Sequence, residues 1–320
     1  MEIFKNGTFL KDTDGNILHA HGGYMLFHNG YYYWYGENRT DNVYVSCYRS
    51  ADLQNWEFRN HILTAASKAE PLPYPTDLSL TNGGDKVNIE RPKVMYCEKT
   101  GQFVMWAHYE NGKDYRCAAA AIATCDTPDG DFVYRGSFNP FGSMSRDCTL
   151  YTEHGITYFV SAANENEDLH VYRLSDDLLC AEELVKKLYV GQLREAPAFF
   201  REGGKTYLLS SYCTGWKPNQ GKYAFADSLL ADWSPLFDLG DDTTFRSQPA
   251  FMLNLDIDGT TQHIYVGDRW GGSAWDLQDD SFDYYQSSYY FSLLEVNGEQ
   301  VTLPPVDTYE ISAVTGFKTV

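Results

Sequence analysis

Five times this chain places a polar or ionisable residue just before a short apolar run, and follows that run with a turn and an aromatic run. The marked positions lie roughly 50 to 70 residues apart, counted from His19, and they are the segment His19-Ala20-His21-Gly22 and the single residues Glu90, Asp147, Glu195 and Gln248. Self-similarity at this interval is typical of repeat architectures whose units are small sheets. Sheets of about four strands arranged radially form a propeller. The sequence therefore predicts an all-β fold, a five-bladed β-propeller.

The repeats run through roughly residues 15 to 295 without a linker or a low-complexity tract. We therefore expect residues 1–320 to form a single domain, in which the terminal residues close or cap the ring. Asn29-Gly30 and Asp258-Gly259 stand between strand-like runs and predict tight hairpin turns. Only residues 176–188 have any helical character, and their pattern is poor.

The acidic balance of the chain argues against a nucleic-acid partner. There are 25 Lys+Arg against 44 Asp+Glu, a net charge of −19, and such a surface repels phosphate backbones. A neutral oligosaccharide is neither attracted nor repelled by this negative charge. The seven cysteines are scattered without a C-x-x-C pair, which gives no support for zinc and fits reduced thiols. No signal peptide or membrane span is visible, so we expect a cytoplasmic protein, or a secreted one whose leader has been removed.

The marked residues open the innermost strand of each predicted blade, so they are expected to converge at one end of the central axis. Proline follows within two positions of Glu90, Glu195 and Gln248. Proline suits the first residues of a strand and pushes the residue before it towards an extended conformation. These three polar groups are therefore predicted to sit at rigid strand entrances.

Carboxylates that converge without a lysine, a cysteine or a Ser–His pair in register indicate proton transfer. Cleavage of a glycosidic bond needs a carboxylic acid whose pKa is raised, so that it can protonate the leaving oxygen. A neighbouring carboxylate raises that pKa by charge repulsion. Asp147 in this role and Glu195 as the acid form the natural pair. An inverting enzyme also needs a base across the ring.

Seven segments in order resemble glycoside hydrolase family 43, and in particular its exo-β-1,3-galactanase branch. They are residues 19–23, 33–38, 146–147, 194–197, 214–216, 247–248 and 267–270. The similarity runs through roughly residues 10 to 295. It implies a five-bladed propeller and an inverting hydrolase of arabinosides, xylosides or galactans.

The resemblance gives Glu195 the role of general acid and Asp147 that of its pKa modulator. Most of the family carries an aspartate base in the first blade, where this chain has residues 19–23 without one. In the galactanase branch a glutamine that matches Gln248 is proposed to hold the water. An amide is a weak base, so three alternatives stay open: Gln248 as water positioner first, Glu90 as base second and His21 third.

Several further residues are expected on the same face, where they would bond sugar hydroxyls or stack on a sugar ring: His21, Glu37, Tyr109, Asn166, Thr214 and Trp216. No cofactor is expected. A calcium ion lies on the axis in some relatives, but no Asp-rich loop marks a site for one here, so the metal content stays open.

The leading functional hypothesis is an exo-acting, inverting hydrolase that releases galactose from β-1,3-galactan or galacto-oligosaccharides. The first alternative is an α-L-arabinofuranosidase or β-xylosidase of the same family, against which the missing first-blade aspartate argues. The second is a carbohydrate-binding propeller without catalysis. A phosphorylase would need a basic phosphate pocket, for which Arg146, Arg194 and Arg269 are the candidates. The sequence does not indicate an oligomeric state.

Overall fold

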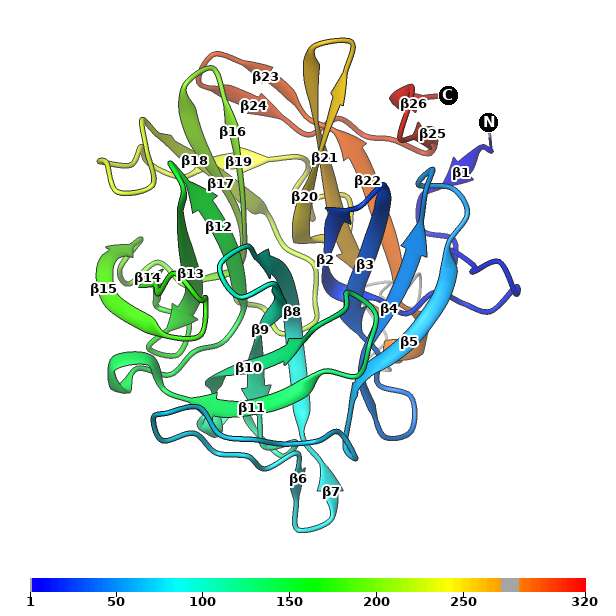
Figure 1. The fold of residues 1–320 in the computed structure, drawn as a ribbon. Helices are drawn as coiled ribbons and strands as arrows, with labels where there is room; N and C mark the ends of the chain where they lie inside the picture. Colours follow the sequence, from blue (N-terminus) through cyan, green and yellow to red (C-terminus); the bar gives the residue numbers. More distant parts are fainter. Residues whose placement is uncertain (1, 272–281) are drawn as a thin grey trace.

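Five antiparallel sheets follow one another along the chain and stand around a common axis (Figure 1). This computed structural model describes residues 2–271 and 282–320. The all-β prediction is confirmed, because the helical segments among the described residues are short 3₁₀ turns, η1 (Tyr115–Cys117), η2 (Pro140–Gly142) and η4 (Tyr284–Gln286). None of the helices described is long and apolar enough to cross a membrane.

Each sheet is one blade, built from strands that are consecutive in the chain and numbered outward from the axis. Blade 1 contains β2 (His21–His28), β3 (Tyr31–Glu37), β4 (Val43–Ser50) and β5 (Glu57–Thr64). Blade 2 contains β8 (Asn88–Cys97), β9 (Gln102–Glu110), β10 (Ala119–Cys125) and β11 (Val133–Phe138). Blade 3 contains β12 (Cys148–Glu153), β13 (Ile156–Ala163), β14 (Asp168–Leu174) and β15 (Ala181–Leu188).

Blade 4 contains β16 (Arg194–Glu202), β17 (Lys205–Tyr212), β18 (Gly221–Ala226) and β19 (Phe237–Leu239). Blade 5 contains β20 (Gln248–Ile257), β21 (Thr260–Arg269) and β22 (Ser288–Leu293). Two short hairpins, β6 (Thr81–Asn82) with β7 (Asp85–Lys86) and β23 (Glu295–Asn297) with β24 (Gln300–Thr302), stand outside the blades. Residues 176–188, the one stretch with helical character, contribute β15 instead of a helix.

The five innermost strands close a ring, since β2, β8, β12, β16 and β20 each contact the next and β20 contacts β2. Five separate apolar clusters fill the spaces between neighbouring blades. Each blade is therefore buried on both faces, as in a stack of sheets around an axis. The predicted five-bladed propeller is confirmed.

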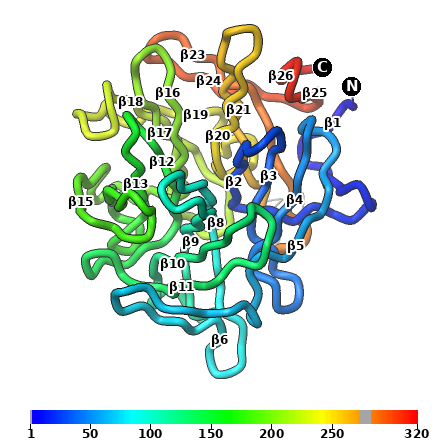
Figure 2. The backbone as a smooth tube through the Cα atoms, viewed as in Figure 1, coloured from blue at the N-terminus to red at the C-terminus, as the bar shows by residue number. Residues whose placement is uncertain are grey.

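The two ends of the chain meet in the last blade (Figure 2). The side chain of Asn6 bonds the backbone of Phe291 in β22, and the amide of Gly7 bonds the carbonyl of Tyr289. Beside this segment, β1 (Phe4–Lys5) pairs with β25 (Thr308–Ser312), which pairs with β26 (Gly316–Thr319). The expectation that terminal residues close the ring is confirmed.

The innermost strands carry an irregularity where the marked residues stand. The pairing with the second strand shifts register after His21, Glu90, Glu195 and Pro249, which is how a β-bulge re-aims a side chain. In three blades the residue after the marked one is left-handed, with φ of 56° at Gly22, 53° at Arg91 and 52° at Ala196.

The expectation of extended backbone before proline is therefore wrong for Arg91 and Ala196, which precede Pro92 and Pro197. Left-handed backbone costs a non-glycine residue about 1–3 kcal/mol and is found most often at functional sites. The bulges thus replace the simple rigid strand entrance by a kink that turns Glu90 and Glu195 towards the axis.

Candidate active site

One pocket lies at the end of the axis where the innermost strands begin. Its cavity volume is about 180 Å³, which is ample for several water molecules or for a small polar ligand such as a sugar ring. All five blades contribute to its lining, which consists of Glu37, Glu90, Arg91, His108, Tyr115, Arg146, Asp147, Asn166, Glu195, Cys213, Gly215, Trp216, Gln248 and Trp270.

Seven of the ten residues predicted from the sequence line this pocket: Glu37, Glu90, Asp147, Asn166, Glu195, Trp216 and Gln248. They come from the ends of strands in different blades, far apart along the chain. The predicted convergence is therefore confirmed for these seven, and His21, Tyr109 and Thr214 are the exceptions.

His21 does not face the pocket. Its ring is fully buried, stacks on Tyr289 with 4.7 Å between ring centroids, and places Nδ1 3.0 Å from Asp268 Oδ1. The same carboxylate accepts a hydrogen bond from the amide of Gly22 at 2.9 Å. His21 thus anchors the start of β2 behind the site, and the placement contradicts its predicted roles as a base or a sugar ligand.

Tyr109 and Thr214 are each one position away from a residue that does line the pocket. Tyr109 packs in the apolar cluster between blades 1 and 2, while its neighbour His108 faces the pocket. Thr214 is exposed, and its hydroxyl donates to the carbonyl of Lys217, while Cys213 and Gly215 line the pocket. Neither side chain is therefore part of the pocket lining, and their sugar contacts stay predictions.

Glu195 and Asp147 come from neighbouring blades and share one region of the pocket. Asp147 Oδ2 accepts from the amide of Ala196 at 3.1 Å, which ties it to the residue next to Glu195. Glu195 Oε1 accepts from Asn166 Nδ2 at 2.7 Å. Burial, and next the charge of Asp147, raise the pKa of Glu195 to about 7. The arrangement gives a carboxyl group that is largely protonated below neutral pH.

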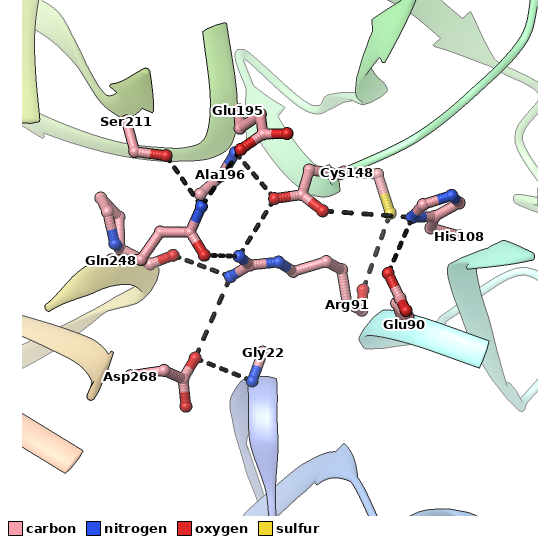
Figure 3. Close-up of polar contacts among 12 residues, drawn as sticks. Gly22, Glu90, Arg91, His108, Cys148, Glu195, Ala196, Ser211, Gln248 and Asp268 are labelled. Atoms are coloured by element: carbon pink, nitrogen blue, oxygen red, sulfur yellow. Dashed lines mark hydrogen bonds and ion pairs between the residues drawn. The ribbon is translucent and has the colours of Figure 1, made fainter. Parts of the chain in front are cut away.

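Arg91 is a buried cation at the centre of the constellation, between Gln248 and Asp268 (Figure 3). Its Nη2 lies 3.0 Å from Asp147 Oδ2 and also donates to Gln248 Oε1, and its Nη1 donates to the carbonyl of Pro249 at 2.9 Å. The left-handed backbone at Arg91 directs this side chain across the axis from blade 2 to blade 5. Arg91 balances the charge of Asp147 and fixes the amide of Gln248.

The amide of Gln248 has one orientation that satisfies its neighbours. Its Oε1 accepts from Arg91 and from Trp270 Nε1 at 2.8 Å, and both partners can only donate. Its Nε2 therefore faces Ser211 Oγ at 2.9 Å and Glu195 Oε2 at 3.5 Å. Both lone pairs of the amide oxygen are occupied, so Gln248 offers no acceptor, and the N–H directed at Glu195 makes only a long contact of 3.5 Å.

Glu90 and Glu37 share a second cation. Arg39 Nη2 lies 2.6 Å from Glu90 Oε1 and 3.2 Å from Glu37 Oε2. Burial, with a smaller contribution from neighbouring Glu90, raises the pKa of Glu37 to about 7 against the opposing charge of Arg39. The hydroxyl of Tyr115 also donates to Glu90 Oε1, at 3.3 Å. The carboxylate of Glu90 is thereby fixed on one side of the pocket.

His108 stands beside Glu90 on the next strand (Figure 3). Glu90, His108 and Asp147 bring one ligand atom each within 4.8 Å of one another, a spacing that suits a metal ion. Arg39 pairs with Glu90 Oε1 and Arg91 with Asp147 Oδ2, whereas the oxygens nearest His108 Nδ1 are Glu90 Oε2 and Asp147 Oδ1. The two guanidinium groups already balance the charge of these carboxylates, and no metal is assigned to this donor set.

Sequence reasoning missed five polar or aromatic residues of the lining, namely Arg91, His108, Tyr115, Cys213 and Trp270. Arg91, His108 and Cys213 each lie one position from a residue that was predicted, so a window around each predicted residue would have found them. Of the three arginines considered for a phosphate pocket, Arg146 lines the pocket, whereas Arg194 bonds Ser210 and Arg269 bonds the carbonyl of Phe245. These three arginines therefore do not gather in the pocket.

Comparison with known proteins agrees with this geometry. The family model for glycosyl hydrolases family 43 matches residues 13–236. The structure of an exo-β-1,3-galactanase from Clostridium thermocellum is 44% identical, with a TM-score of 0.89, and the match covers 99% of this chain and 68% of that one.

Two further solved structures are similar over most of the chain. An exo-β-1,3-galactanase variant from Phanerochaete chrysosporium, solved with β-1,3-galactotriose, is 29% identical, with a TM-score of 0.84 and coverage of 100% and 71%. A family 43 β-1,3-galactosidase solved with galactodeoxynojirimycin is 28% identical, with a TM-score of 0.78 and coverage of 94% and 99%. The search of curated proteins gives no match.

Proposed function

The chain belongs to glycosyl hydrolases family 43, and on that premise we propose that it is an exo-acting, inverting β-1,3-galactanase. It releases galactose from the end of β-1,3-galactan or galacto-oligosaccharides. The observation that carries the proposal is a pocket with room for one sugar ring, in which Glu195 has its pKa raised to about 7 beside Asp147. Relatives described as exo-β-1,3-galactanases support the choice of substrate.

In this mechanism Glu195 protonates the glycosidic oxygen. Its Oε1 is held by a short hydrogen bond from Asn166, whereas Oε2 has only a 3.5 Å contact with Gln248 Nε2. The acidic proton is therefore assigned to Oε2. Asp147, paired with Arg91, lies beside Glu195, and its charge favours that proton on Glu195.

Inversion requires a water on the opposite face of the sugar ring and a group that takes its proton. Gln248 offers no acceptor, so it can orient the water only as a donor, by turning towards it the Nε2 hydrogen that otherwise makes the long 3.5 Å contact with Glu195 Oε2. Among the residues of the lining, we assign Glu90 as the group that accepts the proton of the water. Its carboxylate is fixed by Arg39 and Tyr115 on a different wall of the pocket from Glu195. Trp216 and Trp270 supply apolar faces against which the ring can stack.

The test is NMR of the products from β-1,3-galactobiose, with arabinan and xylan oligomers as competing substrates. The expected result is galactose that appears first as the α anomer, from the β-1,3-linked substrate alone. Glu195→Gln should lower kcat by about 10²–10⁴-fold, the usual contribution of a general acid, and leave galactotriose binding in place. β-Galactose as the first product, or a Glu195→Gln enzyme with full activity, contradicts the proposal.

The same assay assigns the two groups near the water. Glu90→Gln should abolish turnover at every pH, because the proton acceptor is lost. Gln248→Ala should reduce kcat by about 10²–10³-fold, the cost of one positioned hydrogen-bond donor. A Gln248→Ala enzyme with undiminished kcat would remove this residue from the reaction.

A further inference from the structure

In the wall of the pocket, His108 lies among three carboxylates. It is 1% exposed, and its Nε2 lies 3.0 Å from Glu110 Oε1. On the pocket side, its Nδ1 lies 3.4 Å from Glu90 Oε2 and 4.0 Å from Asp147 Oδ1. Glu110 is equally buried and is not part of the pocket lining. Blade 2 supplies His108, Glu90 and Glu110, while Asp147 reaches across from blade 3.

Carboxylate oxygens face both ring nitrogens, which favours a proton on each of them. An ionised carboxylate accepts hydrogen bonds and cannot donate them, so a nitrogen lone pair that faced Glu90 or Glu110 would repel it. Burial alone lowers the pKa of His108. The hydrogen bond to Glu110 and the charges of Glu90, Glu110 and Asp147 outweigh burial, so the net effect is a raised pKa.

The groups around His108 balance this charge. The titratable and charged groups that surround it are Glu90 and Arg91 on β8, Glu110 on β9, Tyr115 on η1, and Arg146 and Asp147 just before β12. Arg39 pairs with Glu90, and Arg91 pairs with Asp147. Each of these two carboxylates therefore has a guanidinium group on one side. His108 supplies the cation on the other side.

Resting on the proposed function, we propose that His108 is a positioning residue, an imidazolium that Glu110 holds from behind and that fixes the carboxylate of Glu90 towards the water. Glu110 pairs with His108 from outside the pocket lining, so it acts on the reaction only through His108. Loss of the His108 proton turns a lone pair towards Glu90 and releases that carboxylate from its position. The alkaline limit of the reaction then depends on His108 as well as on Glu195.

The discriminating variant is Glu110→Gln, which removes the charge but keeps an oxygen that accepts from Nε2. His108 then loses its proton at lower pH. Above neutrality kcat should fall about tenfold relative to wild type, the equivalent of one pKa unit, while KM changes little and the rate below pH 6 is nearly unchanged. The matched control is Glu202→Gln, because His263 Nε2 lies at the same 3.0 Å from Glu202 Oε2, outside this pocket. This control should keep the wild-type pH profile.

A second measurement uses the unaltered enzyme. In ¹⁵N NMR, the signal assigned to His108 by its absence from His108→Asn should show both ring nitrogens protonated at pH 7. A neutral His108 in wild type, or a Glu110→Gln profile identical to wild type, overturns the inference. So does activity that is lost on chelation and restored by a divalent metal, since the metal would then occupy Nδ1. If Glu195→Gln is inactive while these outcomes occur, the proposed function stands and only the role of His108 fails.

Discussion

At the scale of single residues, the charge of Asp147 controls the proton of Glu195. The rate requires protonated Glu195, so activity is present below the pKa of about 7 and is lost as the pH rises through it. Asp147→Asn removes the repulsion and leaves Arg91 without its partner. Both changes favour ionised Glu195, so the alkaline limb of kcat/KM should move to lower pH by about one unit.

The measurement is kcat/KM for galactobiose between pH 4 and pH 9 for wild type and Asp147→Asn. The loss of rate should be larger at pH 7 than at pH 5. A limb at the wild-type position would show that the two carboxyl groups are not coupled, although they share the pocket.

At the scale of the strand, the bulge in β2 depends on a glycine. Gly22 has a φ of 56°, and a Cβ there would lie 2.5 Å from Glu37 Oε1 and 3.1 Å from Arg91 Cδ. Gly155 is also left-handed, with a φ of 78°, but has nothing within 4 Å. Gly22→Ala should therefore destabilise the fold by about 1–3 kcal/mol more than Gly155→Ala, the usual cost of overpacking, and should lower kcat/KM.

Urea unfolding of both variants gives the comparison, because the two share the backbone cost of a left-handed alanine. Equal losses of stability would mean that Glu37 and Arg91 move away freely. The site would then not depend on the tight approach of β2 to β8.

The strands also explain what the sequence could and could not reveal. Glu90, Glu195 and Gln248 were recognisable because proline marks the start of their strands. His108 was missed in favour of Tyr109, because both faces of β9 are buried: Trp106 packs towards blade 3 and Met105 towards blade 1. Without an exposed face there is no alternation of polarity to give the direction of a side chain.

The left-handed backbone at Arg91 is the second gap in the prediction. Residues before proline disfavour helical backbone, so the local sequence indicates an extended residue there. The kink exists because the surrounding blades hold it, and that information is absent from the segment itself. The propeller was predictable from the repeat and half of the lining from the sequence, whereas the direction of single side chains was not.

At the scale of the whole molecule, the ring is held shut by contacts between the two ends of the chain. Asn6 Nδ2 donates to the carbonyls of Phe291 and Val306 at 2.8 and 3.0 Å, and its Oδ1 accepts from the amide of Phe291 at 2.8 Å. Asn6→Ala leaves these buried backbone groups unpaired, at a cost of about 2–4 kcal/mol. The control is Asn60→Ala, whose side chain bonds Asp131 at the surface.

Denaturant unfolding should show the loss for Asn6→Ala and a change below about 0.5 kcal/mol for the surface control. The kcat of the folded variant should stay near that of wild type, because Asn6 is outside the pocket lining. A stability equal to wild type would assign closure of the ring to the apolar packing between blades 5 and 1.

The pairing of β1 with β25 and β26 also bears on the order in which the blades are connected. Because these strands lie side by side, a short peptide could link them, and the polypeptide could be opened instead at the surface turn of Gly203 and Gly204. Such a circular permutant would form the same pocket from the same five blades, although the blades would be connected in a different order. Catalysis in this enzyme depends on the closed ring of blades and not on the blade at which the polypeptide starts.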